Sequence, residues 1–172
     1  MRKIHLLLSL MIVCGYGYAV AAPIDSVSKI RTLVRQIDSE RHYITRTLEN
    51  DEFMGGTDNG SSLTGYYKDG RLVKIAEWVG LSHCILTTEF YLDGGKPIFV
   101  YLQERSFPYL VPGDSFDYDH PEIVLEARYY FRKGKLIRKN SKGAGACSAG
   151  EFDVADLLKS FQRDSQLLKK RK

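Results

Sequence analysis

Apolar residues follow three different patterns along this chain. Residues 4–13 are a nearly continuous apolar run, broken only by His5 and Ser9. From residue 24 the apolar positions recur every three or four residues, which predicts an amphipathic helix that fades between residues 40 and 48. From residue 63 short apolar segments alternate with glycine-containing turns, which is typical of β-hairpins. The apolar face of the first helix comprises Val27, Ile30, Val34 and Ile37.

Three segments share one hairpin pattern. Each has two adjacent aromatic or aliphatic residues, a two-residue turn that contains glycine, and a basic residue that leads into an apolar strand. Turns such as Asp69-Gly70 and Gly94-Gly95 favour the type I′ geometry, which requires positive φ at both central residues. Counting outward from the turns predicts two cross-strand pairs in each hairpin. The pairs are Tyr67 with Leu72 and Tyr66 with Val73, Leu92 with Pro97 and Tyr91 with Ile98, and Phe131 with Leu136 and Tyr130 with Ile137.

A second helical pattern lies near the end of the chain. Ser148 and Glu151 fit a capping box, and apolar residues recur after them at helical spacing. The patterns together predict a single α+β domain over residues 22–172. It has an antiparallel sheet of about six strands from three β-hairpins, with an N-terminal and a C-terminal helix, at least one of them packed on the sheet. The apolar face of the second helix comprises Phe152, Ala155, Leu158, Phe161 and Leu168.

Three stretches of sequence carry a resemblance to a known repeat. They are Tyr66-Tyr67-Lys68-Asp69-Gly70-Arg71-Leu72, Phe90-Tyr91-Leu92-Asp93-Gly94-Gly95-Lys96 and Tyr129-Tyr130-Phe131-Arg132-Lys133-Gly134-Lys135-Leu136. Over residues 63–139 the chain resembles exported bacterial proteins built on YYxDGKL-type repeats, a variant of the MORN hairpin repeat. The resemblance implies an open antiparallel β meander and a role in protein or surface interaction. It carries over no catalytic residue.

The apolar run near the start is predicted to be a cleavable signal peptide of residues 1–21. Positive charge precedes it, and Ala19 and Ala21 follow it at the spacing that signal peptidase requires. The run has about half of the ~20 residues in a membrane-spanning helix, so we expect no stable membrane insertion after cleavage. Val13 stands before Cys14 where a lipoprotein signal requires Gly, Ala or Ser, which argues against a lipid anchor. We therefore expect a periplasmic or secreted protein.

Charge and cysteine content narrow the functional classes. The formal net charge is +4, and two of these charges leave with the signal peptide, so too few remain for a nucleic-acid-binding protein. Export would place Cys84 and Cys147 in an oxidising compartment, which makes a disulfide between them the first hypothesis. Two separate buried thiols are the alternative.

Residues 108–121 form a long irregular connection between the second and third hairpins, and loops of this length are often functional. Asp114, Asp117, Asp119 and His120 lie in it. Oxygen ligands on a flexible loop suit Ca²⁺, but the spacing of an EF-hand is absent. We therefore favour a solvated acidic loop in which side chains bond their own backbone, with no bound metal.

Two further patterns suggest chemistry. Gly113-Asp114-Ser115 resembles the serine nucleophile motif of one esterase family, although the matching Asp and His partners are not recognisable. The pair His83 and Cys84, with His120 and Cys147, could form a zinc site or a thiol nucleophile, although the spacing of zinc ligands is absent. A hydrolase or metal-dependent enzyme that uses loop 108–121 is the alternative function.

The chain has eleven tyrosines, eight phenylalanines and one tryptophan. An aromatic sheet face can bind a sugar or a protein, and the candidate ligand-binding residues are Tyr66, Tyr91 and Tyr130. If a helix covers this face the tyrosines belong to the core, which is the reading we favour. The sequence predicts an exported, non-enzymatic binding protein without a cofactor. Its partner is expected to be another protein or a glycan at the cell envelope.

Overall fold

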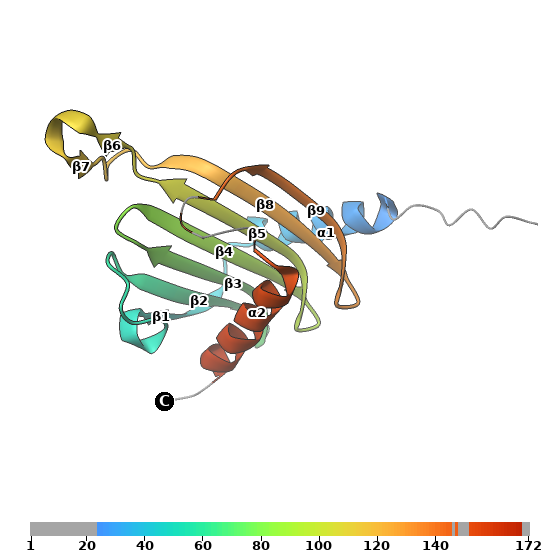
Figure 1. Ribbon diagram of the computed structural model, residues 1–172. Coiled ribbons are helices and arrows are strands. Elements are labelled where there is room, and N and C mark those ends of the chain that lie inside the picture. The colour runs from blue at the N-terminus through green and yellow to red at the C-terminus, as the bar shows by residue number, and fades with distance from the viewer. Residues whose placement is uncertain (1–23, 146, 148–151, 170–172) are drawn as a thin grey trace, which may run out of the picture.

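The computed structural model describes residues 24–145, 147 and 152–169. Its centre is one antiparallel sheet of seven strands in which the spatial order follows the chain (Figure 1). The predicted α+β architecture is confirmed, with a helix at each end of the described chain. The sheet strands are β1 (Ile44–Glu49), β2 (Ser61–Lys68), β3 (Arg71–Gly80), β4 (Cys84–Asp93), β5 (Lys96–Ser106), β8 (Glu122–Arg132) and β9 (Lys135–Gly143).

The helices lie on opposite faces of this sheet (Figure 1). They are α1 (Ile24–Ser39) and α2 (Val154–Lys169). Between β5 and β8 the chain leaves the sheet and forms a small ribbon of β6 (Tyr109–Leu110) and β7 (Ser115–Phe116). Single 3₁₀ turns occupy Asn50–Glu52 and Val111–Gly113. Within the described residues, neither helix is long and apolar enough to cross a membrane.

The three predicted hairpin turns are present. Both central residues have positive φ in each turn, as the type I′ geometry requires. Lys133 adopts φ 51° there although it is not glycine, asparagine or aspartate. The central pairs are Asp69 and Gly70, Gly94 and Gly95, and Lys133 and Gly134.

The pairing next to each turn is as predicted, but the next pair outward is wrong in all three hairpins. The register shifts by one residue on the outgoing strand, so Tyr66 faces Lys74 and not Val73. In the same way Tyr91 faces Phe99, and Tyr130 faces Arg138. Counting along the sequence assumes that every residue of one strand pairs with one residue of the next. A β-bulge inserts one extra residue on one strand, so the pairing beyond it shifts by one and the strand twists more strongly.

The alternation of side chains between the two sheet faces explains why two large residues stand next to each other in several strands. Successive side chains of a strand point to opposite faces of the sheet. Tyr129 therefore packs in the cluster beneath α2, while Tyr130 packs in the cluster beneath α1. Phe90 and Tyr91 divide between the two faces in the same manner. Each such pair contributes one ring to each side of the sheet.

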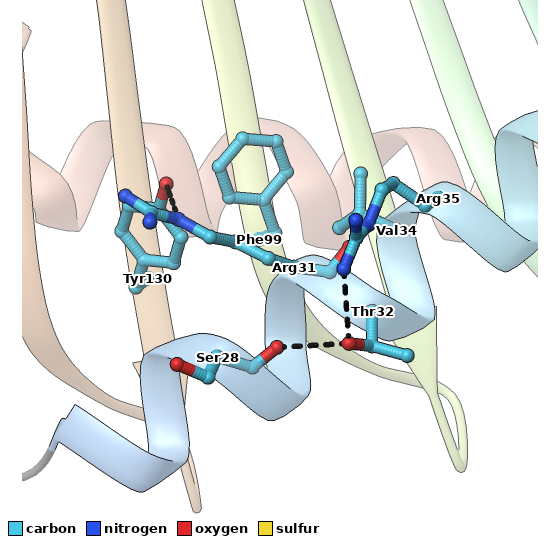
Figure 2. Close-up of a pocket in the computed structure, with 7 residues that line it drawn as sticks. All are labelled: Ser28, Arg31, Thr32, Val34, Arg35, Phe99 and Tyr130. Carbon is cyan, nitrogen blue, oxygen red and sulfur yellow. Dashed lines mark hydrogen bonds between the residues drawn. The ribbon is translucent and has the colours of Figure 1, made fainter.

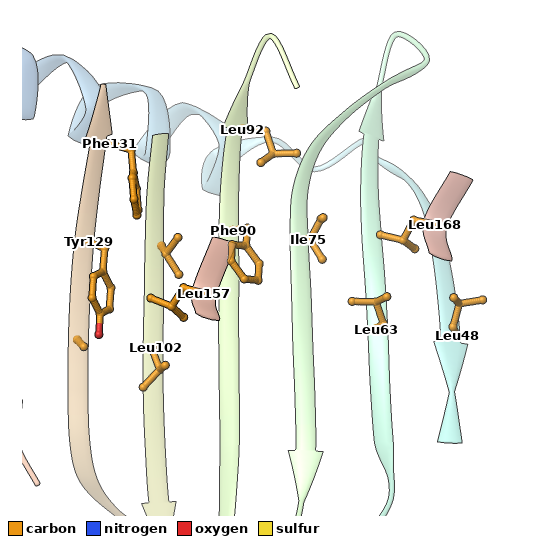
Figure 3. Packing of buried hydrophobic residues seen from close by; sticks show 12 residues of the cluster. Leu48, Leu63, Ile75, Phe90, Leu92, Leu102, Tyr129, Phe131, Leu157 and Leu168 are labelled. Carbon is orange, nitrogen blue, oxygen red and sulfur yellow. The ribbon is translucent and has the colours of Figure 1, made fainter. Parts of the chain in front are cut away.

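The larger hydrophobic core lies between the sheet and α2 (Figure 3). Leu157 and Leu168 of the helix are both buried against residues from six strands. Ala155, expected on the apolar face, is exposed, whereas Val154 and Leu158 pack against the core. The predicted capping residues Ser148 and Glu151 lie outside the described residues. The sheet side of this core comprises Leu48, Leu63, Ile75, Phe90, Leu92, Val100, Leu102, Ala127, Tyr129 and Phe131.

The N-terminal helix is shorter than predicted. It ends at Ser39, and residues 44–49 form β1 where a fading helix was expected. The expected six strands become seven for this reason. In β1, Thr45 and Thr47 point to one face while Leu48 is buried on the other, and β-branched residues fit such a half-buried strand.

Cys84 at the start of β4 and Cys147 after β9 form a disulfide, with their Cα atoms 5.7 Å apart. The bridge, our first hypothesis, is therefore confirmed. It joins positions 63 residues apart and connects the segment that leads to α2 with the sheet. The predicted signal peptide, residues 1–21, lies outside the described residues.

Candidate functional site

The three tyrosines proposed as ligand-binding residues lie on the sheet face that carries α1. Tyr91 and Tyr130 are each only 3% exposed, and both belong to the cluster beneath α1. Tyr66 is half-buried and meets Tyr43 edge-on, with ring centroids 5.7 Å apart. A helix thus covers two of the three rings, and no flat platform made of all three is open to a ligand.

The Tyr91 hydroxyl connects α1 to the sheet. It lies 2.9 Å from a carboxylate oxygen of Asp38 on α1 and 2.8 Å from one of Glu89. Lys74 donates to the same hydroxyl and forms ion pairs with both carboxylates. Burial, followed by the negative charge of Glu89 and Asp38, raises the pKa of Tyr91 far above its usual range. Burial lowers the pKa of Lys74, but its bonds to Glu89 and Asp38 outweigh this and raise it.

Beside α1 the sheet forms an open pocket of ≈ 490 Å³ (Figure 2). Tyr130 is the one proposed ligand-binding tyrosine that lines it, and its hydroxyl accepts a hydrogen bond from Arg31 at 3.3 Å. Arg35 lies one helical turn further along and donates to Thr32 at 3.3 Å. The sequence offered a signal for this pair, because Arg31 and Arg35 are four residues apart and so share one side of the helix.

Beyond this pocket the same sheet face carries a polar network. The Tyr101 hydroxyl donates to Glu126 and accepts a hydrogen bond from Gln103 at 2.8 Å. Arg128 pairs with Glu126 at 3.2 Å and stacks over the Tyr101 ring. Gln103 in turn accepts from Arg105 at 2.7 Å. These hydrogen bonds link the side chains into one network on the sheet surface.

A second pocket of ≈ 730 Å³ lies between α2 and the turns of two hairpins. Leu72, Leu92 and Phe161 give it apolar walls. The Ser165 hydroxyl, at its edge, is buried without a hydrogen-bond partner in the described structure.

A buried acidic pair lies between α2 and β3. Arg163 of α2 bonds both Glu77 and Asp164 at 2.8 Å, and the Asp164 side chain is fully buried. Burial and the neighbouring Asp164 carboxylate raise the pKa of Glu77 well above its usual value, although Arg163 acts in the opposite direction. Sequence reasoning missed this pair. Its only signal was that Asp164 interrupts the apolar spacing between Phe161 and Leu168.

Loop 108–121 projects from the end of the sheet (Figure 1), and we call this loop, together with the first two residues of β8, which pair with β5, the arm (residues 108–123). Eight large hydrophobic side chains are exposed among the described residues, and five of them belong to the arm. Val111 at its tip is 81% exposed. The five are Tyr109, Leu110, Val111, Tyr118 and Ile123.

The acidic residues of the arm do not converge on one point. Asp114 accepts the Tyr109 hydroxyl, whereas Asp117 bonds the His120 ring at 3.0 Å and the Asp119 backbone N–H at 3.1 Å. His120 is 81% exposed. In the described parts of the chain no group of three or more His, Cys, Asp or Glu side chains could hold a metal ion.

The geometry does not support the serine nucleophile at Ser115 or the cysteine and histidine site. Cys84 and Cys147 are oxidised to a disulfide, so neither supplies the thiolate that a zinc ligand or a nucleophile requires. Ser115 lies exposed in β7, and the His120 ring is hydrogen-bonded to Asp117. No family model, curated protein or solved structure matches this chain.

Proposed function

We propose that the protein is an exported, non-enzymatic binding protein, and that its partner is a protein with a basic and apolar surface that contacts the arm. The observation that carries the proposal is the concentration of exposed large hydrophobic side chains on this one projecting segment. Large apolar side chains exposed together are typical of protein-interaction sites. The disulfide is compatible with export.

The charge of the arm supports a basic partner. Residues 108–123 contain four acidic residues and no lysine or arginine, although the whole chain has a net charge of +4. Complementary charge steers association and disfavours wrong partners. The acidic residues are Asp114, Asp117, Asp119 and Glu122.

Aromatic packing holds the arm in shape. Phe107, only 7% exposed, anchors its base, and the Tyr118 ring lies 4.9 Å from it between centroids. Phe116 meets Tyr109 edge-on at 5.5 Å and Tyr118 at 6.3 Å. An ordered ribbon loses less conformational entropy on binding than a flexible loop, so its exposed side chains can contribute more to affinity.

Site-specific photo-cross-linking tests the proposal. A photoreactive amino acid replaces Val111 at the tip of the arm, and in a matched variant it replaces Ile44 on edge strand β1, which is 75% exposed. In cells that produce the protein, we expect one discrete adduct from position 111 and none from position 44. The adduct should weaken when Asp117 and Asp119 become Asn, because the partner's basic groups lose their counter-charges.

The partner identified in the adduct is then purified and titrated with the wild-type protein and a Leu110→Ser/Val111→Ser variant, in which both altered side chains are exposed. We expect at least a tenfold loss of affinity, as for central interface side chains, and an unchanged melting temperature. Equal cross-linking from both positions, no adduct at position 111, or equal affinity of the variant would each contradict the proposal.

A further inference from the structure

The pocket beside α1 combines two arginines with an aromatic floor (Figure 2). We propose that it binds a small organic anion whose carboxylate or phosphate group meets the guanidinium groups of Arg31 and Arg35 while its apolar body lies on Phe99. The pocket and the arm occupy opposite ends of β5 and β8, so this inference does not depend on the proposed function. The lining residues are Ser28, Arg31, Thr32, Val34, Arg35, Phe99 and Tyr130.

The lining contains two positive charges and no acidic residue. Arg31 donates to the Tyr130 hydroxyl, and Arg35 donates to the Thr32 hydroxyl and to the Arg31 carbonyl oxygen. All three acceptors are neutral. Asp38, further along α1, is bonded to Lys74 and Tyr91. Over the described residues, neither arginine forms an ion pair with a carboxylate.

The two arginines place two cationic groups at one pocket. They are four residues apart on α1, so their side chains leave the same side of the helix about one turn apart. In Figure 2 the Arg31 side chain reaches toward the Tyr130 hydroxyl, and the Arg35 guanidinium turns back toward Thr32. Guanidinium groups present planar forks that match carboxylate and phosphate oxygens.

The aromatic floor of the pocket, formed by Phe99 and Tyr130, is the reason to expect an organic ligand. Phe99 and Tyr130 are 7% and 3% exposed, with ring centroids 5.0 Å apart, and Val34 borders them. The Arg31 guanidinium carbon lies 5.7 Å from the centre of the Tyr130 ring. Both rings are almost fully buried, so an apolar body would contact their outer edges and the half-buried Val34, a contact that a bare inorganic anion does not make. The volume lies within the ~300–1,000 Å³ that small-molecule sites occupy.

Titration of the mature chain with simple probes tests the inference. Benzoate and phenyl phosphate carry both parts of the proposed ligand, whereas inorganic phosphate lacks the apolar body and benzyl alcohol lacks the charge. Binding is measured by chemical-shift changes in the protein NMR spectrum. We expect benzoate or phenyl phosphate to bind at least tenfold more tightly than either incomplete probe, with shifts at Phe99 and Tyr130.

Three variants test the role of the arginines. Arg35→Gln should weaken binding of the complete probe about tenfold, the usual effect of losing one charged hydrogen bond. Lys29→Gln, on the same helix and outside the pocket lining, should leave it unchanged. Arg31→Lys keeps the charge and removes the fork, so binding should weaken while the melting temperature is retained.

Several outcomes would overturn the inference. If inorganic phosphate bound as tightly as phenyl phosphate, the aromatic floor would not contribute to binding. If benzyl alcohol bound as tightly as benzoate, the arginines would not contribute. An equal loss of probe affinity in Lys29→Gln and Arg35→Gln would show that the effect comes from the net charge of the protein and not from the pocket. Absence of shifts with both complete probes at millimolar concentration would refute the site.

Discussion

Tyr91 of β4 donates its hydroxyl hydrogen to Asp38 of α1 across an oxygen–oxygen distance of 2.9 Å. This contact joins residues 53 apart in sequence and fixes the C-terminal half of α1 to the sheet. Tyr91→Phe should lower the free energy of unfolding by about 1–3 kcal/mol, because the hydroxyl loses its hydrogen bonds to charged side chains. Urea denaturation measures the change. Tyr118→Phe, at a position 54% exposed, is the control and should stay within about 0.5 kcal/mol of wild type.

The Glu77 carboxyl should make stability depend on pH. Its pKa in the folded protein lies well above the ordinary value of 4.5, because it is buried beside Asp164. The folded state therefore holds this proton more tightly than the unfolded state. Its stabilising contribution is complete below pH 4.5 and is lost as the pH rises through the raised pKa, at up to about 1.4 kcal/mol per pH unit.

The variant Glu77→Gln isolates this effect, because glutamine has a similar shape and does not titrate. Its free energy of unfolding should fall less than that of wild type between pH 4.5 and 8. Glu49→Gln, at an exposed position of β1, should follow the wild-type curve. Parallel curves for wild type and Glu77→Gln would show that Glu77 titrates normally.

The disulfide should contribute strongly to stability. Cys84 and Cys147 close a long loop, with a sequence separation of 63, and cross-linking such a loop restricts the unfolded chain. The chain-entropy relation gives roughly 4 kcal/mol. We expect a loss of this order on reduction, measured by urea denaturation with and without reductant. The double variant Cys84→Ser/Cys147→Ser should be destabilised similarly and should not respond to the reductant.

Gly65 of β2 allows α2 to approach the sheet closely. A β-carbon at this position would lie 3.0 Å from a methyl carbon of Leu168 and 3.1 Å from the Tyr67 ring. Gly65→Ala should therefore destabilise the protein by about 1–3 kcal/mol through overpacking. Leu168→Ala should lose about 2–5 kcal/mol because it leaves a cavity.

The double variant Gly65→Ala/Leu168→Ala tests whether these two positions are in contact. The new methyl group would occupy part of the space vacated by Leu168, so the double variant should be more stable than the sum of the single changes predicts. A coupling of about 0.5–3 kcal/mol is typical of residues in contact. Simple additivity would indicate that α2 does not pack on Gly65.

The hairpins show where sequence reasoning succeeds. The glycine-containing turns, the alternating strands and the amphipathic helices depend on neighbouring residues, so the sequence predicts them directly. Gly70 and Gly134 adopt the positive φ expected of them. The bulges, which lie just beyond the second strand pair from each turn, were missed, because no residue type in the sequence marks them.

Long-range packing decided the candidate sites. The sequence by itself determined the fold class, the two cysteines of the bridge and the acidic, aromatic character of the arm. Only the tertiary structure placed α1 over Tyr91 and Tyr130, set Arg31 and Arg35 above Phe99, and buried Glu77 beside Asp164. These contacts join residues far apart in the chain, and their geometry depends on which sheet face each helix covers, a choice that no local pattern encodes.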